Sequence, residues 1–217
     1  GDILGGGLIL TVGSFFVNLA ALDSGSAYGG VGSSRTVMLS ILAEPTLILV
    51  FVGITLMAKS MLPFVVNHLL VANSAVFWSP THLFLVLAFF ILLLVETDKL
   101  PIHSSTHIEV YMIEEARILE YSGPLLGLLK WASMMKQFIL YTIFCNVLLL
   151  PWGLSVHGTA LGIFAATVVL VLKLFLIGAV MIVVQTSQSR LRFYRYQEPL
   201  AASFLLAILA IIANQIR

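Results

Sequence analysis

The sequence is poor in charge and in cysteine, and both shortages narrow what the chain can be. Of its 217 residues, 10% are charged, whereas an ordinary soluble domain carries about a quarter. A chain this poor in charge is not a soluble globular domain. The formal net charge of +1 gives no strong field, so we expect no nucleic-acid partner. The single cysteine, Cys145, excludes an internal disulfide and a cysteine-based metal cage.

Long apolar runs dominate the sequence instead. Hydrophobic residues make up 60% of the chain, and the runs reach roughly 18 residues, the length that crosses a bilayer. Strands of a membrane barrel alternate between apolar and polar residues, and these runs do not. We therefore predict an all-α, polytopic transmembrane helical bundle, with residues 1–217 forming a single integral membrane domain. The six predicted spans are Ile3–Leu22, Thr36–Ala58, Thr81–Val95, Trp131–Leu150, Thr159–Val184 and Pro199–Ala213.

The connections between these spans differ in character. Asp23–Arg35 is rich in glycine and serine and is expected to be a loop, and a short surface or re-entrant helix is expected around Phe64–Val76. Residues 96–130 are charged and residues 185–198 are basic. Loops rich in lysine and arginine stay in the cytoplasm, so we predict that these two loops share the cytoplasmic face, where a soluble partner could dock. The basic residues assigned to this side are Arg35, Lys99, Arg117, Lys130, Arg190, Arg192 and Arg195.

The 96–130 loop carries the signature of an acidic amphipathic helix. Thr106 and Glu109 have the spacing of a capping box, which predicts a helix from His107 to Tyr121. Its apolar positions recur at helical spacing. The carboxylates around the rest of this helix are Glu109, Glu114, Glu115 and Glu120. They are either the solvated face of an interfacial helix or a cluster that leads protons or cations toward Glu96, and the pattern alone does not separate these alternatives.

Three charged residues fall inside the predicted spans. Glu44, Lys136 and Lys173 lie at depths where a charge costs on the order of a few kcal/mol, and such groups usually face the bundle interior and pair. Glu44 and Lys173 are too deep to reach the interface easily, whereas Lys136 could extend its ammonium to the cytoplasmic interface. Pro45 lacks a backbone donor and can kink the helix beside Glu44. Intramembrane charge therefore predicts an ion path or a structural ion pair.

No motif of a catalytic centre is present. The sequence has no nucleophile elbow, phosphate-binding loop or cysteine cluster. His103 and His107 are spaced like helical metal ligands, but no third ligand accompanies them. His82 lies near a predicted membrane boundary, where headgroups would accommodate its polar tip. We predict neither a catalytic residue nor a metal site in this chain.

Several ordered segments resemble the family of formate hydrogenlyase subunit 4 and hydrogenase 4 component C. The stretch Asn18–Arg35 resembles the loop after that family's third helix, and Ile41–Ile48, with its Glu44-Pro45 step, resembles the next helix. The remaining matching segments are Glu96-Thr-Asp-Lys-Leu-Pro101, Leu119-Glu-Tyr-Ser-Gly123, Lys130-Trp131, Lys136-Gln137, Lys173 and Ser189-Arg-Leu-Arg192. The family is homologous to the membrane protein that joins the peripheral arm to the membrane arm in NADH–quinone oxidoreductase, or complex I.

Two departures limit what carries over. Gly1 aligns just before the family's third helix, so we expect either a truncated sequence or a shorter relative of an eight-helix subunit. The family's Pro-Phe-Asp and the carboxylates after it are replaced by Pro101-Ile-His103 and residues 104–109. Family residues can still be matched by position to Glu96, Lys99 and Glu120. Glu44 is matched through the proline that follows it.

The resemblance implies a multi-pass subunit of a prokaryotic inner membrane with no redox centre of its own. It implies that partner subunits hold a nickel–iron centre and iron–sulfur clusters in a peripheral arm, that antiporter-like subunits lie beside it in the membrane, and that lipid surrounds it. The expected ion pathway comprises Glu44, Glu96, Lys136 and Lys173. Coupling residues are expected at Asp98, Lys99, Glu109, Glu114, Glu115 and Glu120. Arm-docking residues are expected at Arg35, Arg190 and Arg192.

The expected function is therefore that of a membrane anchor and coupling subunit in a complex I-like, energy-converting hydrogenase. Three alternatives stay open at this point. The chain could form the quinone chamber of a complex I-type enzyme, or act as a stand-alone ion transporter, although no inverted repeat is visible. It could also be a structural scaffold in which the buried charges only pair.

Overall fold

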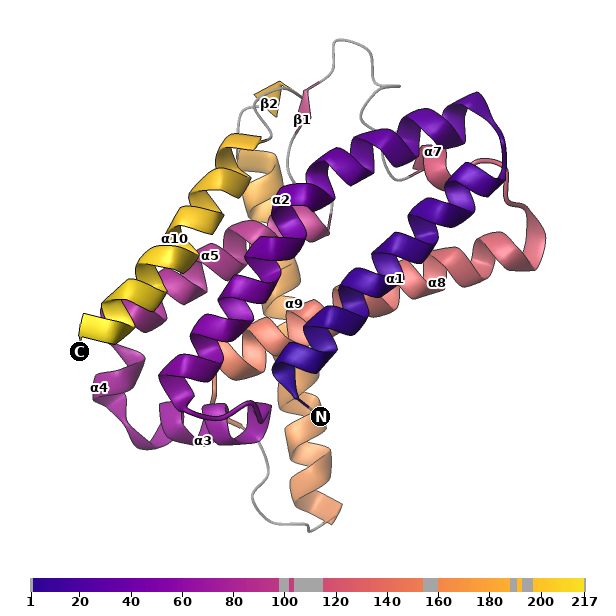
Figure 1. Ribbon diagram of the computed structural model, residues 1–217. Coiled ribbons are helices and arrows are strands. Elements are labelled where there is room, and N and C mark those ends of the chain that lie inside the picture. Colours follow the sequence, from indigo (N-terminus) through magenta and orange to yellow (C-terminus); the bar gives the residue numbers. More distant parts are fainter. Residues whose placement is uncertain are drawn as a thin grey trace.

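The computed structural model is a helical bundle, and it describes residues 2–97, 102–103, 115–153, 160–187, 191–192 and 197–216 (Figure 1). Of the predicted site residues, Asp98, Lys99, Glu109, Glu114 and Arg190 lie outside this part of the chain. The helices are α1 (Ile3–Asp23), α2 (Ala27–Ala58), α3 (Pro63–Ala72), α4 (Ser74–Phe77), α5 (Pro80–Glu96), α7 (Glu115–Ile118), α8 (Gly123–Ile143), the π-helix η1 (Phe144–Leu149), α9 (Ala160–Ser187) and α10 (Gln197–Ile216). Two short strands, β1 (Ile102–His103) and β2 (Leu191–Arg192), accompany them.

Every predicted span corresponds to a helix, which confirms the polytopic helical bundle. In the part of the chain that is described, five helices are long and apolar enough to cross a membrane: α1, α2, α8 with η1, α9 and α10. The third predicted span is α5, an apolar helix of 17 residues. At 1.5 Å per residue it extends about 25 Å, slightly less than the hydrocarbon core of a bilayer.

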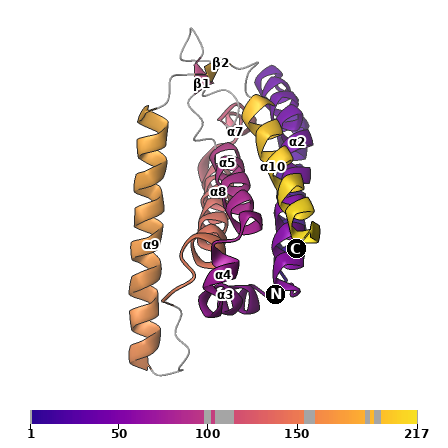
Figure 2. The same ribbon diagram turned by 90° about the vertical axis from the view of Figure 1, so that its left-hand side faces the viewer.

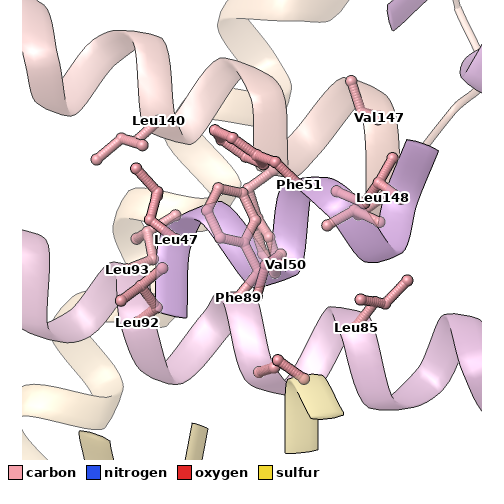
Figure 3. Close-up of a cluster of buried hydrophobic side chains, with 14 of the residues drawn as sticks. Leu47, Val50, Phe51, Leu85, Phe89, Leu92, Leu93, Leu140, Val147 and Leu148 are labelled. Carbon is pink, nitrogen blue, oxygen red and sulfur yellow. The ribbon is translucent and has the colours of Figure 1, made fainter. Parts of the chain in front are cut away.

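The core of the bundle is built around α5, which packs against α2, α10 and η1 (Figure 3). Phe89 of α5 lies between two other rings: its centroid is 5.6 Å from that of Phe51 on α2 and 5.7 Å from that of Phe144 on η1. Both contacts are edge-to-face, the geometry that aromatic rings prefer. Leu85 of α5 packs closely against Gly53 of α2, where an added Cβ would lie 2.6 Å from a leucine methyl. This short separation explains why glycine occupies the α2 position.

The two charge-rich loops meet at one end of the bundle. Strands β1 and β2 pair in parallel, with Ile102 opposite Leu191 and His103 opposite Arg192. Figures 1 and 2 show this pair at the same end as the α1–α2 turn and α7. The described residues 102–103 of the first loop and 191–192 of the second therefore lie side by side. Their cytoplasmic orientation stays a prediction.

The glycine- and serine-rich segment before the second span is a helix, contrary to the expected loop. α2 begins at Ala27, because the Ser26 hydroxyl accepts a hydrogen bond from the Gly29 N–H at 2.9 Å and caps the helix. An added Cβ at Gly32 would lie 2.9 Å from the Ala116 methyl of α7. In a membrane bundle small residues allow this kind of close helix approach, so here they serve packing and not a turn.

A second boundary difference is the start of α8. α8 begins at Gly123, eight residues before the predicted Trp131, because Gly123 adopts a φ of +61° and Pro124 occupies the first turn. The expected short helix around residues 64–76 is present as α3 and α4, which lie across the end of the bundle opposite β1 and β2 (Figure 1). Helix α9 lies at the outside of the bundle and contacts α8 and η1 (Figure 2).

Candidate functional site

A half-buried ion pair joins the end of α5 to α8. The Lys136 ammonium lies 2.6 Å from a carboxylate oxygen of Glu96, and the two side chains are 29% and 11% exposed, respectively. Lys136 also donates a hydrogen bond to the Ser14 hydroxyl of α1 at 3.0 Å. The ammonium thus pairs with the carboxylate that ends α5. Whether this pair lies at the cytoplasmic interface stays a prediction. Three helices that are distant in sequence meet at this pair.

Glu44 of α2 lies within electrostatic reach of the pair. Its side chain is half-buried, and Glu96 and Lys136 are the charged groups that act electrostatically on it. No salt bridge to Glu44 forms within the described residues. Pro45 removes a donor from the next turn, which leaves the Ile41 carbonyl without its usual helical partner. α2 continues through the proline and changes direction near its middle (Figure 1). Because the three predicted residues Glu44, Glu96 and Lys136 interact electrostatically, we refer to them as the charged cluster.

A cavity of about 570 Å³ adjoins this cluster. It lies between α1, α2, α5, α7 and α8 and has a mainly apolar wall, within the size range of pockets that bind small molecules. Its polar lining includes Ser14, Glu96, Arg117, Lys130, Lys136 and Gln137. Both residues of the ion pair therefore face the cavity.

The short helix α7 is fastened across the α1–α2 end of the bundle. Arg117 donates a hydrogen bond to the Asn18 amide oxygen at 3.2 Å, and the Tyr121 hydroxyl donates to the Ala20 carbonyl at 2.9 Å. Within the described residues, the predicted acidic helix is helical only over Glu115–Ile118, and residues 119–120 form a turn. Glu120 is exposed. The sequence did not single out the Arg117–Asn18 bond, because a lone asparagine in an apolar run has no distinctive pattern.

Lys173 forms a separate polar centre. Its side chain lies on α9 and the residue is 6% exposed. The ammonium donates to the Asn146 amide oxygen at 3.0 Å, to the Leu150 carbonyl at 2.7 Å and to the Trp152 carbonyl. Three acceptors match the three N–H groups of a charged lysine. These oxygens lie at the carboxyl end of η1 and just beyond it, where a cation is favourable. Lys173 is thus bonded to neutral oxygens and not to the carboxylate of Glu44 or Glu96.

Two further side chains complete this centre. Asn67 of α3 donates to the carbonyls of Asn146 at 2.5 Å and Pro151 at 2.8 Å. The Nε2 atom of His82 lies 3.1 Å from the Leu148 carbonyl, and the residue is 2% exposed. His82 is therefore buried in the bundle. We had expected its polar tip to lie among lipid headgroups. Its polar role was missed because its partner is a backbone carbonyl, which sequence does not reveal.

Two of the predicted docking arginines, Arg35 and Arg192, lie in the described part of the chain. Arg35 is partly exposed in the third turn of α2, and Arg192 belongs to β2.

Cys145 is 1% exposed, which agrees with its interpretation as a small buried hydrophobic residue.

Comparison with known proteins assigns the family. A multi-pass helical bundle with a charged, cavity-facing cluster is the kind of structure found in membrane-embedded subunits of larger complexes. Residues 2–215 match the family model described as NADH dehydrogenase. The chain belongs to this family.

Two curated relatives from Escherichia coli (strain K12) confirm the resemblance drawn from the motifs. Hydrogenase-4 component C is 32% identical over 214 residues, which covers 97% of this chain and 65% of the relative. Formate hydrogenlyase subunit 4 is 29% identical over 220 residues, which covers 98% of this chain and 68% of that protein. The chain thus spans about two thirds of the length of these relatives.

Proposed function

We propose that this chain is the membrane anchor and coupling subunit of a complex I-like, energy-converting nickel–iron hydrogenase. In this role it links electron transfer in a peripheral arm to the movement of protons or other cations. The family match and the names of the two relatives support the class of complex. The observation that carries the coupling role is the half-buried Lys136–Glu96 pair, which faces a cavity and lies beside Glu44.

The peripheral arm would dock on the end of the bundle that carries the β1–β2 pair. Arg35, Arg190 and Arg192 would contact the arm, which would hold the nickel–iron centre and the iron–sulfur clusters. Antiporter-like subunits would pack beside the chain in the membrane. The apolar outer face of α9, where Leu161 and Phe175 are each 81% exposed, would contact them or lipid.

Coupling would begin with a change of charge in the arm. Electron arrival near the docking end would alter the field at Glu120 and at the 96–130 loop, with Asp98, Lys99, Glu109, Glu114 and Glu115. The α7 helix is fastened to α1 and lines the cavity through Arg117, so a movement of the loop would reach the ion pair. A proton or cation would then pass by way of Glu44, Glu96 and Lys136, and Lys173 would serve as a further station.

Glu44→Gln tests this role, because it keeps the size of the side chain and removes its charge. We expect ion uptake by membrane vesicles to fall about tenfold or more per turnover of the assembled complex, since a positioned proton carrier contributes at least that much. Assembly, and electron transfer to an artificial acceptor, should stay near the wild-type level. The matched control is Glu198→Gln at the start of α10, where the carboxylate is exposed. Wild-type uptake by Glu44→Gln would remove Glu44 from the path.

The cavity favours one second candidate, a quinone chamber. Its volume of about 570 Å³ and mainly apolar wall suit an apolar ring, and the Glu96–Lys136 pair could exchange protons with a quinone. Quinone extracted from the purified complex, together with inhibition by quinone-site ligands, would favour this candidate over the hydrogenase role. A complex that is free of quinone and insensitive to such ligands would exclude it.

A further inference from the structure

Between the two polar centres of the bundle, α8 and η1 carry polar side chains that the proposed function does not yet use. Gln137 lies next to Lys136 on α8 and lines the cavity. One turn further, its amide donates a hydrogen bond to the Tyr141 hydroxyl at 2.9 Å. Cys145 and Asn146 follow after another turn, and Asn146 accepts the bond from Lys173. A polar stripe about 13 Å long therefore runs from the cavity cluster to the Lys173 centre.

The surroundings make this stripe unusual. Tyr141 is 9% exposed and packs in the apolar core with Leu140 and Phe144. A hydroxyl in such a place is costly unless it is hydrogen-bonded. Its one bond within the described residues uses a lone pair of the oxygen, because Gln137 is the donor. The proton of the Tyr141 hydroxyl is thus left for another acceptor.

Other buried hydroxyls of the core differ on this point. Thr46 donates to the Leu42 carbonyl at 2.6 Å, and Ser203 donates to the Ala88 carbonyl at 2.7 Å. Their protons are held by backbone carbonyls, which do not pass a proton on. Tyr141 alone among these three can both receive and release a proton.

We propose that Tyr141 is a proton relay between the Glu96–Lys136 pair and Lys173, and that Gln137 is the residue that positions it. This inference rests on the proposed function and names a route within it. Lys173 accepts a proton only after it has given one up, because the charged ammonium has no lone pair. In each transfer the neutral Lys173 amine takes the proton that Tyr141 releases, while the Tyr141 oxygen takes one up from the cavity side, so that Tyr141 is unchanged and Lys173 is charged again. The remaining interval, from Tyr141 to Asn146, is about 7 Å of helix rise, and transfer across it would need one or two bridging waters.

Tyr141→Phe is the direct test, because it removes only the hydroxyl and keeps the packed ring. Proton uptake per turnover, normalised to the amount of assembled complex in membrane vesicles, should fall about tenfold or more. Electron transfer to an artificial acceptor should not change. The residual uptake should also show an altered solvent deuterium isotope effect, which a purely structural defect would not produce. Gln137→Met, which leaves the hydroxyl in place but unsupported, should cause a smaller loss of uptake.

Two controls match these variants. Tyr28→Phe removes a hydroxyl from an exposed tyrosine, and Thr142→Val removes one from the neighbouring, partly exposed position of α8. Both should pump like the wild type. Normal uptake by Tyr141→Phe would overturn the relay, as would an equal loss in Tyr141→Phe and Thr142→Val.

Glu96→Gln, measured in the same vesicles, separates the relay from the function on which it rests. If Glu96→Gln stops uptake and Tyr141→Phe does not, the coupling role stands and the relay is wrong. If both variants pump normally, the coupling role and the relay are both wrong.

Discussion

At the scale of single residues, the Lys136–Glu96 pair is the feature on which the site depends. Both side chains are largely withdrawn from solvent, and Ser14 supplies an additional acceptor for the ammonium. Removal of one partner from such a pair is costly, because the other charge is left without compensation. Replacement of both partners by apolar groups avoids that cost.

This reasoning predicts the outcome of a double-mutant cycle. Lys136→Met should lower the free energy of unfolding by about 2 kcal/mol, less than for a fully buried pair because the lysine is partly exposed. Lys136→Met combined with Glu96→Leu should recover most of that loss while ion uptake stays abolished. The free energies are measured by denaturation in detergent. Strictly additive effects of the two substitutions would show that the pair is not coupled.

The residues that sequence identified are those whose charge contrasts with an apolar run. Glu44 and Lys136 were recognised in this way, and Glu96 was recognised where the third span ends. Neutral polar residues such as Gln137 and Asn67 were missed, because one amide in a long apolar helix gives no pattern. Lys173 was recognised, but its partners were not. They are the Asn146 amide oxygen of η1 and the Leu150 and Trp152 carbonyls just beyond it, and sequence does not show where an α-helix widens to a π-helix.

At the scale of helices, a glycine of α1 allows its close approach to α2. An added Cβ at Gly7 would lie 2.6 Å from a ring carbon of Phe51, which is 0% exposed and cannot move aside. Nothing lies within 4 Å of the equivalent position at Gly6. The neighbouring glycines of α1 are therefore not equivalent.

A matched pair of substitutions tests this difference. Gly7→Ala should destabilise the bundle by about 1–3 kcal/mol through overpacking. Gly6→Ala should be neutral or stabilising, because alanine favours the helix and meets no neighbour. Thermal unfolding of the two variants in the same detergent gives the comparison. Equal unfolding temperatures would contradict the packing described for α1 and α2.

Helix positions were predictable from the apolar runs, but helix ends were not. The segment before Thr36 contains several glycines and serines, which are typical of loops, yet nine residues before Thr36 already belong to α2. Gly32 allows α7 to approach, a tertiary reason that is not visible in local sequence. The early start of α8 has a similar cause, because Gly123 and Pro124 begin the helix before the apolar run does.

At the scale of the whole molecule, the charge distribution predicts which end faces the cytoplasm. The β1–β2 pair brings the two charged loops together, while α3 and α4 lie at the opposite end. The orientation rule for lysine and arginine then places Ser122 toward the cytoplasm and Ser74 toward the other side.

Single cysteines test this orientation. Ser122 and Ser74 are exposed, and the native Cys145 is 1% exposed, so it should give little background labelling. A maleimide that cannot cross membranes should label Ser74→Cys in intact cells and Ser122→Cys only in inverted vesicles. The reverse pattern would show that the bundle is inserted with its loops outside.

The central claim is that this chain anchors and couples a redox arm, and mass spectrometry of the complex that co-purifies with it in mild detergent tests that claim most directly. We predict a nickel–iron large subunit, iron–sulfur proteins and antiporter-like membrane subunits in the same complex. NADH-oxidising partners would favour the quinone chamber instead. Recovery of the chain alone, as a stable homo-oligomer, would contradict the claim and leave a transporter as the better explanation.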